Sequence, residues 1–158
     1  MLLYIWIRFE WQFSLGAVVA LIHDVIITMG IFSFLSYEIN LSIVAAVLTI
    51  VGYSMNDTVV IFDRIRENLR KYSKISIADI SNTSMNETLS RTLITSITTL
   101  LALFSIYIFG GAILKGFSLA MIIGVIVGTY SSIFVATPIL NYTNVSQKSV
   151  LKDTEENN

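Results

Sequence analysis

The chain has 158 residues, of which 54% are hydrophobic and 13% charged, with a net charge of −1 and a mean hydropathy of +0.74. Soluble domains have about 25% charged residues, so this composition excludes an ordinary soluble domain and predicts a polytopic membrane protein. The absence of cysteine excludes disulfides and thiolate metal sites, and the single histidine excludes a multi-histidine metal centre. We expect no metal, no cofactor and, at this net charge, no nucleic-acid partner.

The chain opens with MLLYIWI, seven residues that are too few for a signal-peptide core or a membrane span. We interpret residues 1–7 as the end of a helix whose beginning is missing. A helix needs about 20 residues to cross a bilayer, and four apolar stretches are that long. We place these spans at about 13–35, 41–62, 92–114 and 116–140. Residues 1–140 therefore predict an all-α membrane domain, a helical bundle, followed by a polar tail at 141–158.

The connections differ in length. Gly110 and Gly111 predict a tight turn between the last two spans. The polar segment 63–90 has apolar residues at helical spacing in its first part, which predicts a helix that extends past the membrane surface before an interfacial segment. Ser84 and Glu87 have the spacing of a capping box, so we expect the third helix to begin there, before its apolar part.

Charge predicts the orientation of the spans. Eight of the ten Lys and Arg fall on one side of a four-span threading: Arg8, Arg64, Arg66, Arg70, Lys71, Lys74, Lys148 and Lys152. Lys115 falls on the other side. Because cytoplasmic loops carry the excess of basic residues, we expect segments 8–12 and 63–90 and the C-terminus to be cytoplasmic.

Asp57 lies in the second predicted span, within GYSMNDTVV. A carboxylate at the centre of a span costs about 2.5–3.5 kcal/mol, so it needs compensation by neighbours or by function. Helical spacing predicts one polar stripe of Tyr53, Ser54, Asp57 and Thr58 that faces protein or water. The alternative is a packing contact in which Asp57 bonds a neighbouring hydroxyl.

Arg91 opens the third span and is the natural counter-charge for Asp57. Arg91, Thr95, Thr98 and Ser105 recur at helical spacing and predict a second polar stripe. The alternative is an anchor, because an arginine at the cytoplasmic end of a span often reaches to the membrane surface.

Asp24 lies near the middle of the first complete span. Gly16, Ala20, Asp24 and Thr28 repeat every four residues, so this acid is predicted to face a helix interface. His23 precedes it, and a His-Asp pair can pass protons because imidazole titrates near neutral pH. However, neighbouring residues on a helix point about 100° apart, so the two need not act together.

The last span has a small residue at every fourth position: Gly116, Ala120, Gly124, Gly128, Ser132 and Ala136. Small residues let helix backbones approach closely in membranes. This pattern predicts a helix-packing groove and specifies no chemistry.

Three long stretches carry a resemblance to a known family: GYSMNDTVVIFDRIRENLRKY, NETLSRTLITSITTLLALFSIYIFGG and GFSLAMIIGVIVGTYSSIFVATPIL. They resemble the C-terminal membrane half of the SecF branch of the SecD/SecF protein-export family. The stretch YIWIRFEWQFSLGAVVALIHDVIIT resembles the preceding spans of that half. The resemblance covers about residues 3–140 and implies part of a six-helix half of this proton-driven export superfamily.

The resemblance implies a multi-pass subunit of the bacterial inner membrane that assists protein translocation and is not an enzyme. The implied partners are SecD, the Sec translocon channel, the translocating polypeptide and membrane lipid. In this family the aspartate of NDT and the arginine of SRT belong to the proton pathway, and SecD adds a further aspartate. By motif match these residues are Asp57 and Arg91, with Asp24 as a less specific candidate.

The family pattern also includes a first span and an external domain that this chain lacks. This leaves open a fragment of a longer or split protein and a degraded gene. A further alternative is a scaffold that only packs against SecD or the translocon. An aspartyl protease dyad of Asp24 and Asp57 is disfavoured, because the contexts here are His-Asp and Asn-Asp. The alternative of half a small-molecule efflux pump is disfavoured, because the residues of these motifs resemble those of the SecF branch.

Overall fold

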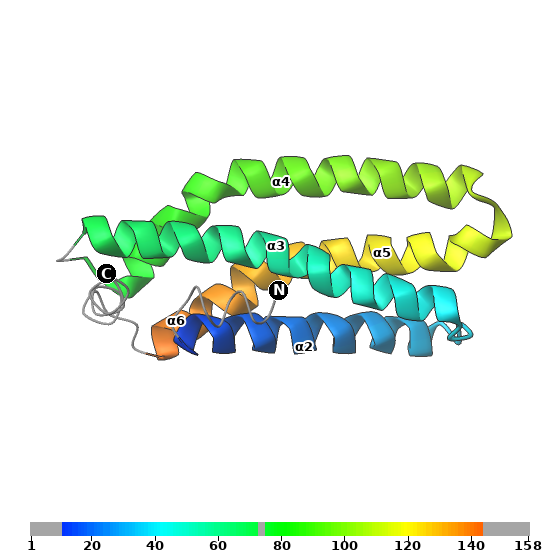
Figure 1. The fold of residues 1–158 in the computed structure, drawn as a ribbon, viewed down its shortest axis with the longest axis horizontal. Coiled ribbons are helices and arrows are strands. Elements are labelled where there is room, and N and C mark those ends of the chain that lie inside the picture. The colour runs from blue at the N-terminus through cyan, green and yellow to red at the C-terminus, as the bar shows by residue number, and fades with distance from the viewer. Residues whose placement is uncertain (1–10, 73–74, 144–158) are drawn as a thin grey trace, which may run out of the picture.

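The computed structural model describes residues 11–72 and 75–143, and these form a bundle of long helices (Figure 1). The elements are α2 (Trp11–Phe34), α3 (Leu41–Lys71), α4 (Ile77–Phe109), α5 (Gly111–Ser131), the π-helical segment η1 (Ser132–Ala136) and α6 (Thr137–Tyr142). The helix end predicted for residues 1–7 and the tail beyond Thr143 lie outside the described residues.

Four helical units are long and apolar enough to cross a membrane: α2, α3, α4 and the continuous run Gly111–Tyr142. In Figure 1, α2 and α4 lie on opposite sides of α3 and α5, and α5 contacts all three of the other long helices. The predicted all-α membrane bundle is therefore confirmed. The depth of each helix in the bilayer stays a prediction.

Polar side chains mark where the helices begin. Asn40 caps α3 by accepting a hydrogen bond from the backbone N–H of Ile43 at 3.1 Å. Ser76 caps α4 by accepting from the backbone N–H of Asp79 at 3.2 Å. The predicted capping box at Ser84 is wrong, because Ser84 is buried inside α4 and donates to the carbonyl of Ile80 at 2.8 Å. A serine inside a helix can bond the preceding turn, so its spacing to an acid does not by itself mark a helix start.

The helices extend beyond the predicted span limits into segment 63–90. α3 continues to Lys71, which confirms the predicted helical extension into 63–90, and α4 begins at Ile77, so most of the segment predicted as interfacial is helical as well. α4 ends at Phe109 and α5 begins at Gly111, whereas the apolar runs had placed these limits at 114 and 116. Gly111 has a φ of +74°, which an L side chain rarely adopts, so the glycine pair sets the turn. The apolar residues after it continue into α5.

The π-helical segment η1 widens the last membrane helix just before Pro138. Proline has no backbone N–H and its ring clashes with the carbonyl four residues earlier. A wider turn keeps the chain helical at such a position. The Thr137 hydroxyl donates to the Ser132 carbonyl at 3.0 Å and so pairs a buried acceptor in this turn.

Two apolar clusters form the core. One contains Phe13, Phe62 and Leu140, and the other contains Phe32, Ile43 and Ile50. Asp24 and Thr28 of α2, Ser54 of α3, and Ser131 and Ser132 of the last membrane helix lie between the two clusters along their helices. The bundle thus has a polar layer between two apolar layers.

Candidate functional site

Asp57 lies on the side of α3 that faces α4. Its side chain is 5% exposed, and its Oδ2 has no hydrogen-bond partner among the described residues. An ionised carboxylate buried without partners is costly in a low dielectric, so the group needs a proton or a nearby positive charge. The predicted alternative, a hydrogen bond between the Asp57 carboxyl group and a neighbouring hydroxyl, is absent within the described residues.

Arg91 lies on the adjacent part of α4 and is exposed. It attracts Asp57 electrostatically across the interface between α3 and α4. In the described part of the chain, however, no ion pair within 4.0 Å joins the two side chains. The predicted counter-charge is therefore near Asp57 without being bonded to it.

The predicted stripe along α3 divides into two. Tyr53 turns with Asp57 toward α4, where its hydroxyl donates to Thr99 Oγ1 at 3.4 Å. Ser54 instead faces α2, and Thr58 faces η1. Positions three and four apart share a broad helix face. Here α4 packs against one part of that face, and α2 and η1 pack against the other part, so the predicted stripe is divided.

Asp24 forms a second acidic centre at the interface of α2 and α3. It is 1% exposed, and its Oδ2 accepts a hydrogen bond from Ser54 Oγ at 2.5 Å. Its Oδ1 lies 3.2 Å from His23 Nδ1. His23 has 31% of its side chain exposed, so the pair connects a buried carboxylate with the surface of the chain. The adjacent residues are in contact although they project in different directions.

A hydroxyl network continues from this centre into η1 and the end of α5. Thr58 Oγ1 lies 2.9 Å from Ser132 Oγ, and Ser132 also donates to the carbonyl of Gly128 at 2.9 Å. A Cβ added at Gly128 would lie 3.1 Å from Ser54 Cβ and 3.6 Å from Asp24 Oδ2. Close approach of α5 therefore holds the hydroxyl partners of Asp24 in place.

The small residues of the last membrane helix all face the interior. All six are buried: Gly116, Ala120, Gly124, Gly128, Ser132 and Ala136. A Cβ at Gly124 would overlap the Ile50 side chain, and the Ala136 carbonyl lies 3.0 Å from a Cβ built at Gly16. Helices α2 and α3 of the same chain occupy this groove, so it offers no free surface to another protein.

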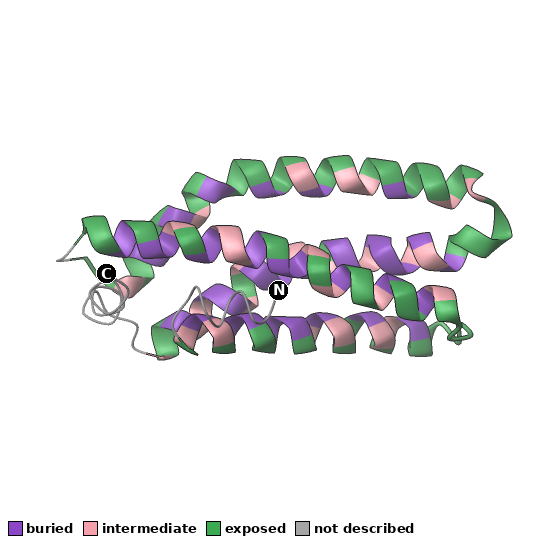
Figure 2. Cartoon of the chain, in the orientation of Figure 1, coloured by how far each residue is buried: buried purple, intermediate pink, exposed green. Residues whose placement is uncertain are grey.

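The polar stripe of α4 behaves differently. Arg91, Thr98 and Ser105 are exposed and Thr95 is half-buried (Figure 2). The three hydroxyls donate to carbonyls of their own helix at 2.8–3.0 Å. The three hydroxyls therefore have hydrogen-bond partners, whereas Arg91, Thr98 and Ser105 are left uncovered by the described residues.

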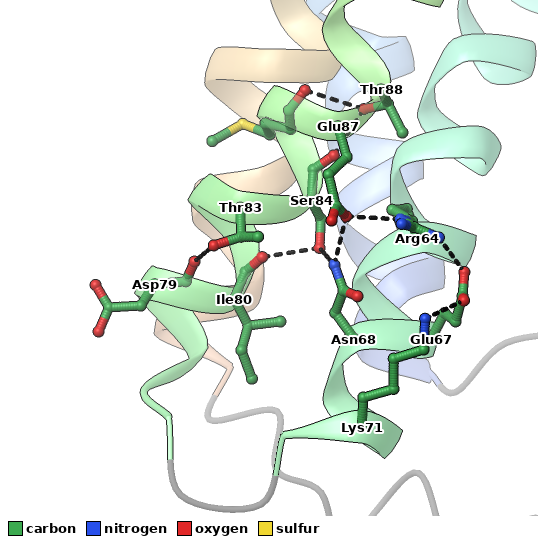
Figure 3. Close-up of polar contacts among 11 residues, drawn as sticks. Arg64, Glu67, Asn68, Lys71, Asp79, Ile80, Thr83, Ser84, Glu87 and Thr88 are labelled. Atoms are coloured by element: carbon green, nitrogen blue, oxygen red, sulfur yellow. Dashed lines mark hydrogen bonds and ion pairs between the residues drawn. The ribbon is translucent and has the colours of Figure 1, made fainter.

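An ionic network joins the polar ends of α3 and α4, and Figure 3 shows it in close-up. Glu87 Oε2 accepts from Arg64 Nε at 2.6 Å and from Asn68 Nδ2 at 2.8 Å. Arg64 also donates to Glu67 at 2.5 Å, and Lys71 donates to Glu67 at 2.6 Å. The bonds from Arg64 and then Asn68 lower the pKa of Glu87 below its ordinary value. The bonds from Lys71 and then Arg64 lower the pKa of Glu67.

A pocket of about 510 Å³ opens beside this network, between α3 and α4. Its lining includes four arginines: Arg64, Arg66, Arg70 and Arg91. It also includes three acids: Asp63, Glu67 and Glu87. The sequence reasoning missed this pocket, because it did not predict that the polar extensions of α3 and α4 lie side by side. The spacing of Arg64, Glu67 and Lys71 signals ion pairs within one helix, but nothing in the sequence shows which acid of α4 completes them.

The described residues contain no group of three His, Asp or Glu side chains that could hold a metal ion. What the site offers is two buried carboxyl groups in different surroundings. Asp24 has hydrogen-bond partners within the chain, whereas Asp57 Oδ2 has none among the described residues. Such a pair suits the binding and release of a cation as small as a proton.

A family model described as "Protein export membrane protein SecD/SecF, C-terminal" matches residues 1–146. A "Protein translocase subunit SecF" of Cereibacter sphaeroides is 53% identical over 152 residues, which cover 96% of this chain and 47% of that protein. The subunit of the same name from Rickettsia rickettsii is 58% identical over 139 residues, covering 88% and 45%. The chain thus spans about half the length of the curated relatives it matches.

Two solved structures of SecDF also match this chain. The crystal structure of SecDF, a translocon-associated membrane protein from Thermus thermophilus, matches with a TM-score of 0.86 and 45% identity. The match covers 91% of this chain and 20% of that one. SecDF in a super-membrane-facing form matches with a TM-score of 0.85 and 43% identity, covering 99% and 21%.

Proposed function

Because the chain belongs to the SecD/SecF family of protein-export membrane proteins, we propose that it is a subunit of a protein-translocation complex in the bacterial inner membrane. It acts there by carrying protons and not as an enzyme. The observation that carries this proposal is Asp57, a buried acid in a predicted span, whose Oδ2 has no hydrogen-bond partner among the described residues and which has an arginine nearby. Intramembrane ionisable residues mark proton relays and ion pathways.

Asp57 is the proposed proton-binding group. Arg91 attracts the ionised carboxylate and so offsets part of the cost of burying it. Because no direct ion pair within the described residues ties up Asp57, its Oδ2 is available to accept a proton. A bonded pair would hold the carboxylate ionised, so the observed separation favours reversible protonation.

Asp24 is the proposed second site of the pathway. His23 contacts it and is partly exposed, so imidazole can pass a proton between the surface of α2 and the buried carboxyl group. Ser54 bonds the other oxygen and connects Asp24 to the hydroxyl network of α3 and α5. This role is separate from that of Asp57, which faces α4.

The proposed partners follow from the uncovered face of the chain. The exposed residues Arg91, Thr98 and Ser105 on a helix that we expect to span the membrane favour a protein neighbour over lipid. We propose a SecD subunit there, which supplies an acid near Arg91. The Sec translocon channel, the exported polypeptide and membrane lipid complete the proposed surroundings.

A scaffold that only packs against SecD or the translocon is the second candidate, and the exposed length of α4 favours it (Figure 2). The small-residue groove does not, because α2 and α3 fill it. The two candidate functions make different predictions for Asp57: the proton carrier requires its carboxyl group, whereas the scaffold does not.

The test is a chimera in which this chain replaces the matching half of a full-length relative, expressed in cells depleted of their own subunit. Asp57→Asn keeps the size of the side chain, so the chimera is expected to assemble while export driven by a proton gradient falls to the uncomplemented level. Glu38→Gln removes one exposed acid outside the bundle and serves as the matched control. Parent-like export by Asp57→Asn under a proton gradient contradicts the relay and leaves the scaffold.

A further inference from the structure

The pocket between α3 and α4 brings together an acid and a base that have no partner among the described residues. Asp63 of α3 and Arg91 of α4 both line it, and both are exposed. In the described part of the chain, neither side chain forms a hydrogen bond or an ion pair. The other charged side chains of the lining have partners of their own: Arg64, Arg66, Glu67, Arg70 and Glu87. Within this lining, Asp63 and Arg91 are therefore the two charges left for each other.

The pairing of α3 with α4 fixes the level at which Arg91 lies. Arg64 Nε donates to Glu87 Oε2 at 2.6 Å across this interface (Figure 3). The two helices run in opposite directions, so a step forward along α4 corresponds to a step back along α3. Arg91 lies four positions after Glu87 and is therefore level with Val60, four positions before Arg64. Val60 lines the pocket together with Arg91, as this register requires.

Two acids of α3 flank this level. Asp57 precedes Val60 by three positions and Asp63 follows it by three. Because an α-helix rises about 1.5 Å per residue, each acid lies about 4.5 Å along the axis from the level of Arg91, one toward each end of α3. The acids themselves are about 9 Å apart along the axis, so one guanidinium group cannot bond both at the same time. Asp57 is the inner, buried acid, whereas Asp63 is the outer, exposed one.

The geometry points to Asp63 as a second partner of Arg91, and we propose that the guanidinium alternates between Asp57 and Asp63. While Asp57 is ionised, its charge attracts Arg91 inward. Once Asp57 is protonated this attraction ends, and Asp63 is the acid of the lining left to bind Arg91. Arginine suits such an exchange, because its guanidinium stays charged while either acid changes state. The Asp63–Arg91 pair is therefore expected when Asp57 is protonated and not when it is ionised.

This inference rests on the proton-carrying function proposed above and adds a residue to it. Asp63 acts as a positioning residue: it carries no proton of the pathway and affects Asp57 only by competing for Arg91. A group that binds one of two states shifts the balance between them, and here that group is the cation of Arg91. An acid of a neighbouring subunit would be a further competitor, so the contact is tested first in the 158-residue chain alone.

The experiment is a double-mutant cycle of Asp63→Asn and Arg91→Gln, made in the parent and again with Asp57→Asn, which imitates the protonated acid. The equilibrium constant of unfolding is measured by circular dichroism during an SDS titration in mixed micelles, at mildly alkaline pH that favours ionised acids in the parent. With Asp57→Asn present, Asp63→Asn is expected to raise this constant about 2- to 5-fold, which is the range for an exposed ion pair. The effect should vanish when Arg91→Gln is added. In the parent, where Asp57 holds the cation inward, we expect no coupling.

The matched control is Glu38→Gln, which removes an exposed acid outside the pocket lining. It should have the same small effect with and without Asp57→Asn. If Glu38→Gln also becomes more costly when Asp57→Asn is added, the change belongs to the net charge of the chain and the proposed exchange is wrong.

A second measurement detects the contact directly and does not depend on the stability of the variants. In Arg91→Lys, a zero-length carbodiimide joins the introduced amine to a carboxylate that it touches. The Lys71–Glu67 contact at 2.6 Å in the same chain is the internal reference. Cross-linking to Asp63, relative to this reference, should rise when Asp57→Asn is added. Equal cross-linking with and without Asp57→Asn overturns the alternation, as does an Asp63–Arg91 coupling that is absent from both cycles or equally strong in both.

Export by the chimera described above separates this inference from the function on which it rests. We expect Asp63→Asn to slow export by a factor similar to that measured in the cycle, and Asp63→Glu, which keeps the charge, to restore it. If Asp57→Asn stops export while Asp63→Asn exports like the parent, the proton-carrying function stands and the alternation of Arg91 is overturned. If Asp57→Asn exports like the parent, the proton-carrying function is wrong, and the alternation is then judged by the cycle alone.

Discussion

Replacing Gly124 by alanine tests the close approach of α5 and α3. A Cβ at this position overlaps the Ile50 side chain at its Cγ1, Cγ2 and Cδ1 atoms. The γ carbons of a β-branched residue are held near its backbone, so Ile50 cannot move aside by a rotamer change alone. Overpacking of a core costs up to about 3 kcal/mol, and alanine regains about 1 kcal/mol over glycine in a helix. We expect Gly124→Ala to lower the free energy of unfolding by ~2 kcal/mol on these two values.

Gly52→Ala is the matched control. Gly52 is exposed in the middle of α3, and nothing lies within 4 Å of a Cβ built there. The same chemical change should therefore stabilise the protein by about 0.5–1 kcal/mol through helix propensity alone. The two alanine substitutions are therefore expected to act in opposite directions.

The assay uses the absence of native cysteine. Ser118 is fully buried, so Ser118→Cys reports unfolding by its rate of thiol labelling during an SDS titration in mixed micelles. Adding Ile50→Ala to Gly124→Ala removes the overlapping atoms, so the two changes should cost less together than the sum of their separate costs. The packing argument fails if Gly124→Ala unfolds like Gly52→Ala, or if the double variant shows only additive losses.

Further predictions concern the polar ends of the helices. The folded pKa of Glu87 lies below its ordinary value of 4.5, so its ionic bonds stabilise the protein above that pH and are lost as pH falls through the lowered value. The melting temperature of Glu87→Gln should therefore fall below that of the parent near neutral pH and approach it in acid. The control Glu38→Gln should show no such convergence. A difference between Glu87→Gln and the parent that stays the same at all pH values would contradict this reasoning. For topology, single cysteines at Asn82 and Ala112 should label from opposite sides of the membrane, and labelling from one side would refute the predicted orientation. We choose Ala112 in preference to its neighbour Gly111, because a side chain at the φ of +74° of Gly111 would be strained.

The helical membrane bundle could be predicted from the sequence because hydropathy and span length leave few alternatives in a bilayer. The limits of the helices were harder to place. An apolar run does not show where a helix turns, and α4 ends at Phe109, five residues before the predicted limit. Lys71 and Ile77 bound helical extensions that are polar on one side, where hydropathy gives little signal.

The candidate acids could be found because a carboxylate in an apolar run is conspicuous. Their surroundings could not, because these depend on which helices meet. Ser54 and Asp57 are three residues apart, yet one bonds an acid of α2 and the other turns to α4. Glu87 and Arg64 are distant in the chain, and only the folded structure brings them to 2.6 Å.

The two buried acids differ in whether their interaction partners lie within the described residues. Asp24 receives its hydrogen bond from Ser54 and its contact from His23, and α5 packs against both Asp24 and Ser54. Asp57 Oδ2 has no hydrogen-bond partner among the described residues, and the nearby Arg91 is exposed beside the uncovered stripe of α4. A buried charge persists only where something compensates it, so we expect Asp57 to be compensated by a proton, by water or by a group outside the described residues, such as one from another protein on the α4 side. A neighbour on that side would reach Asp57 and Arg91 together, whereas Asp24 would keep its partners whether or not the neighbour is bound.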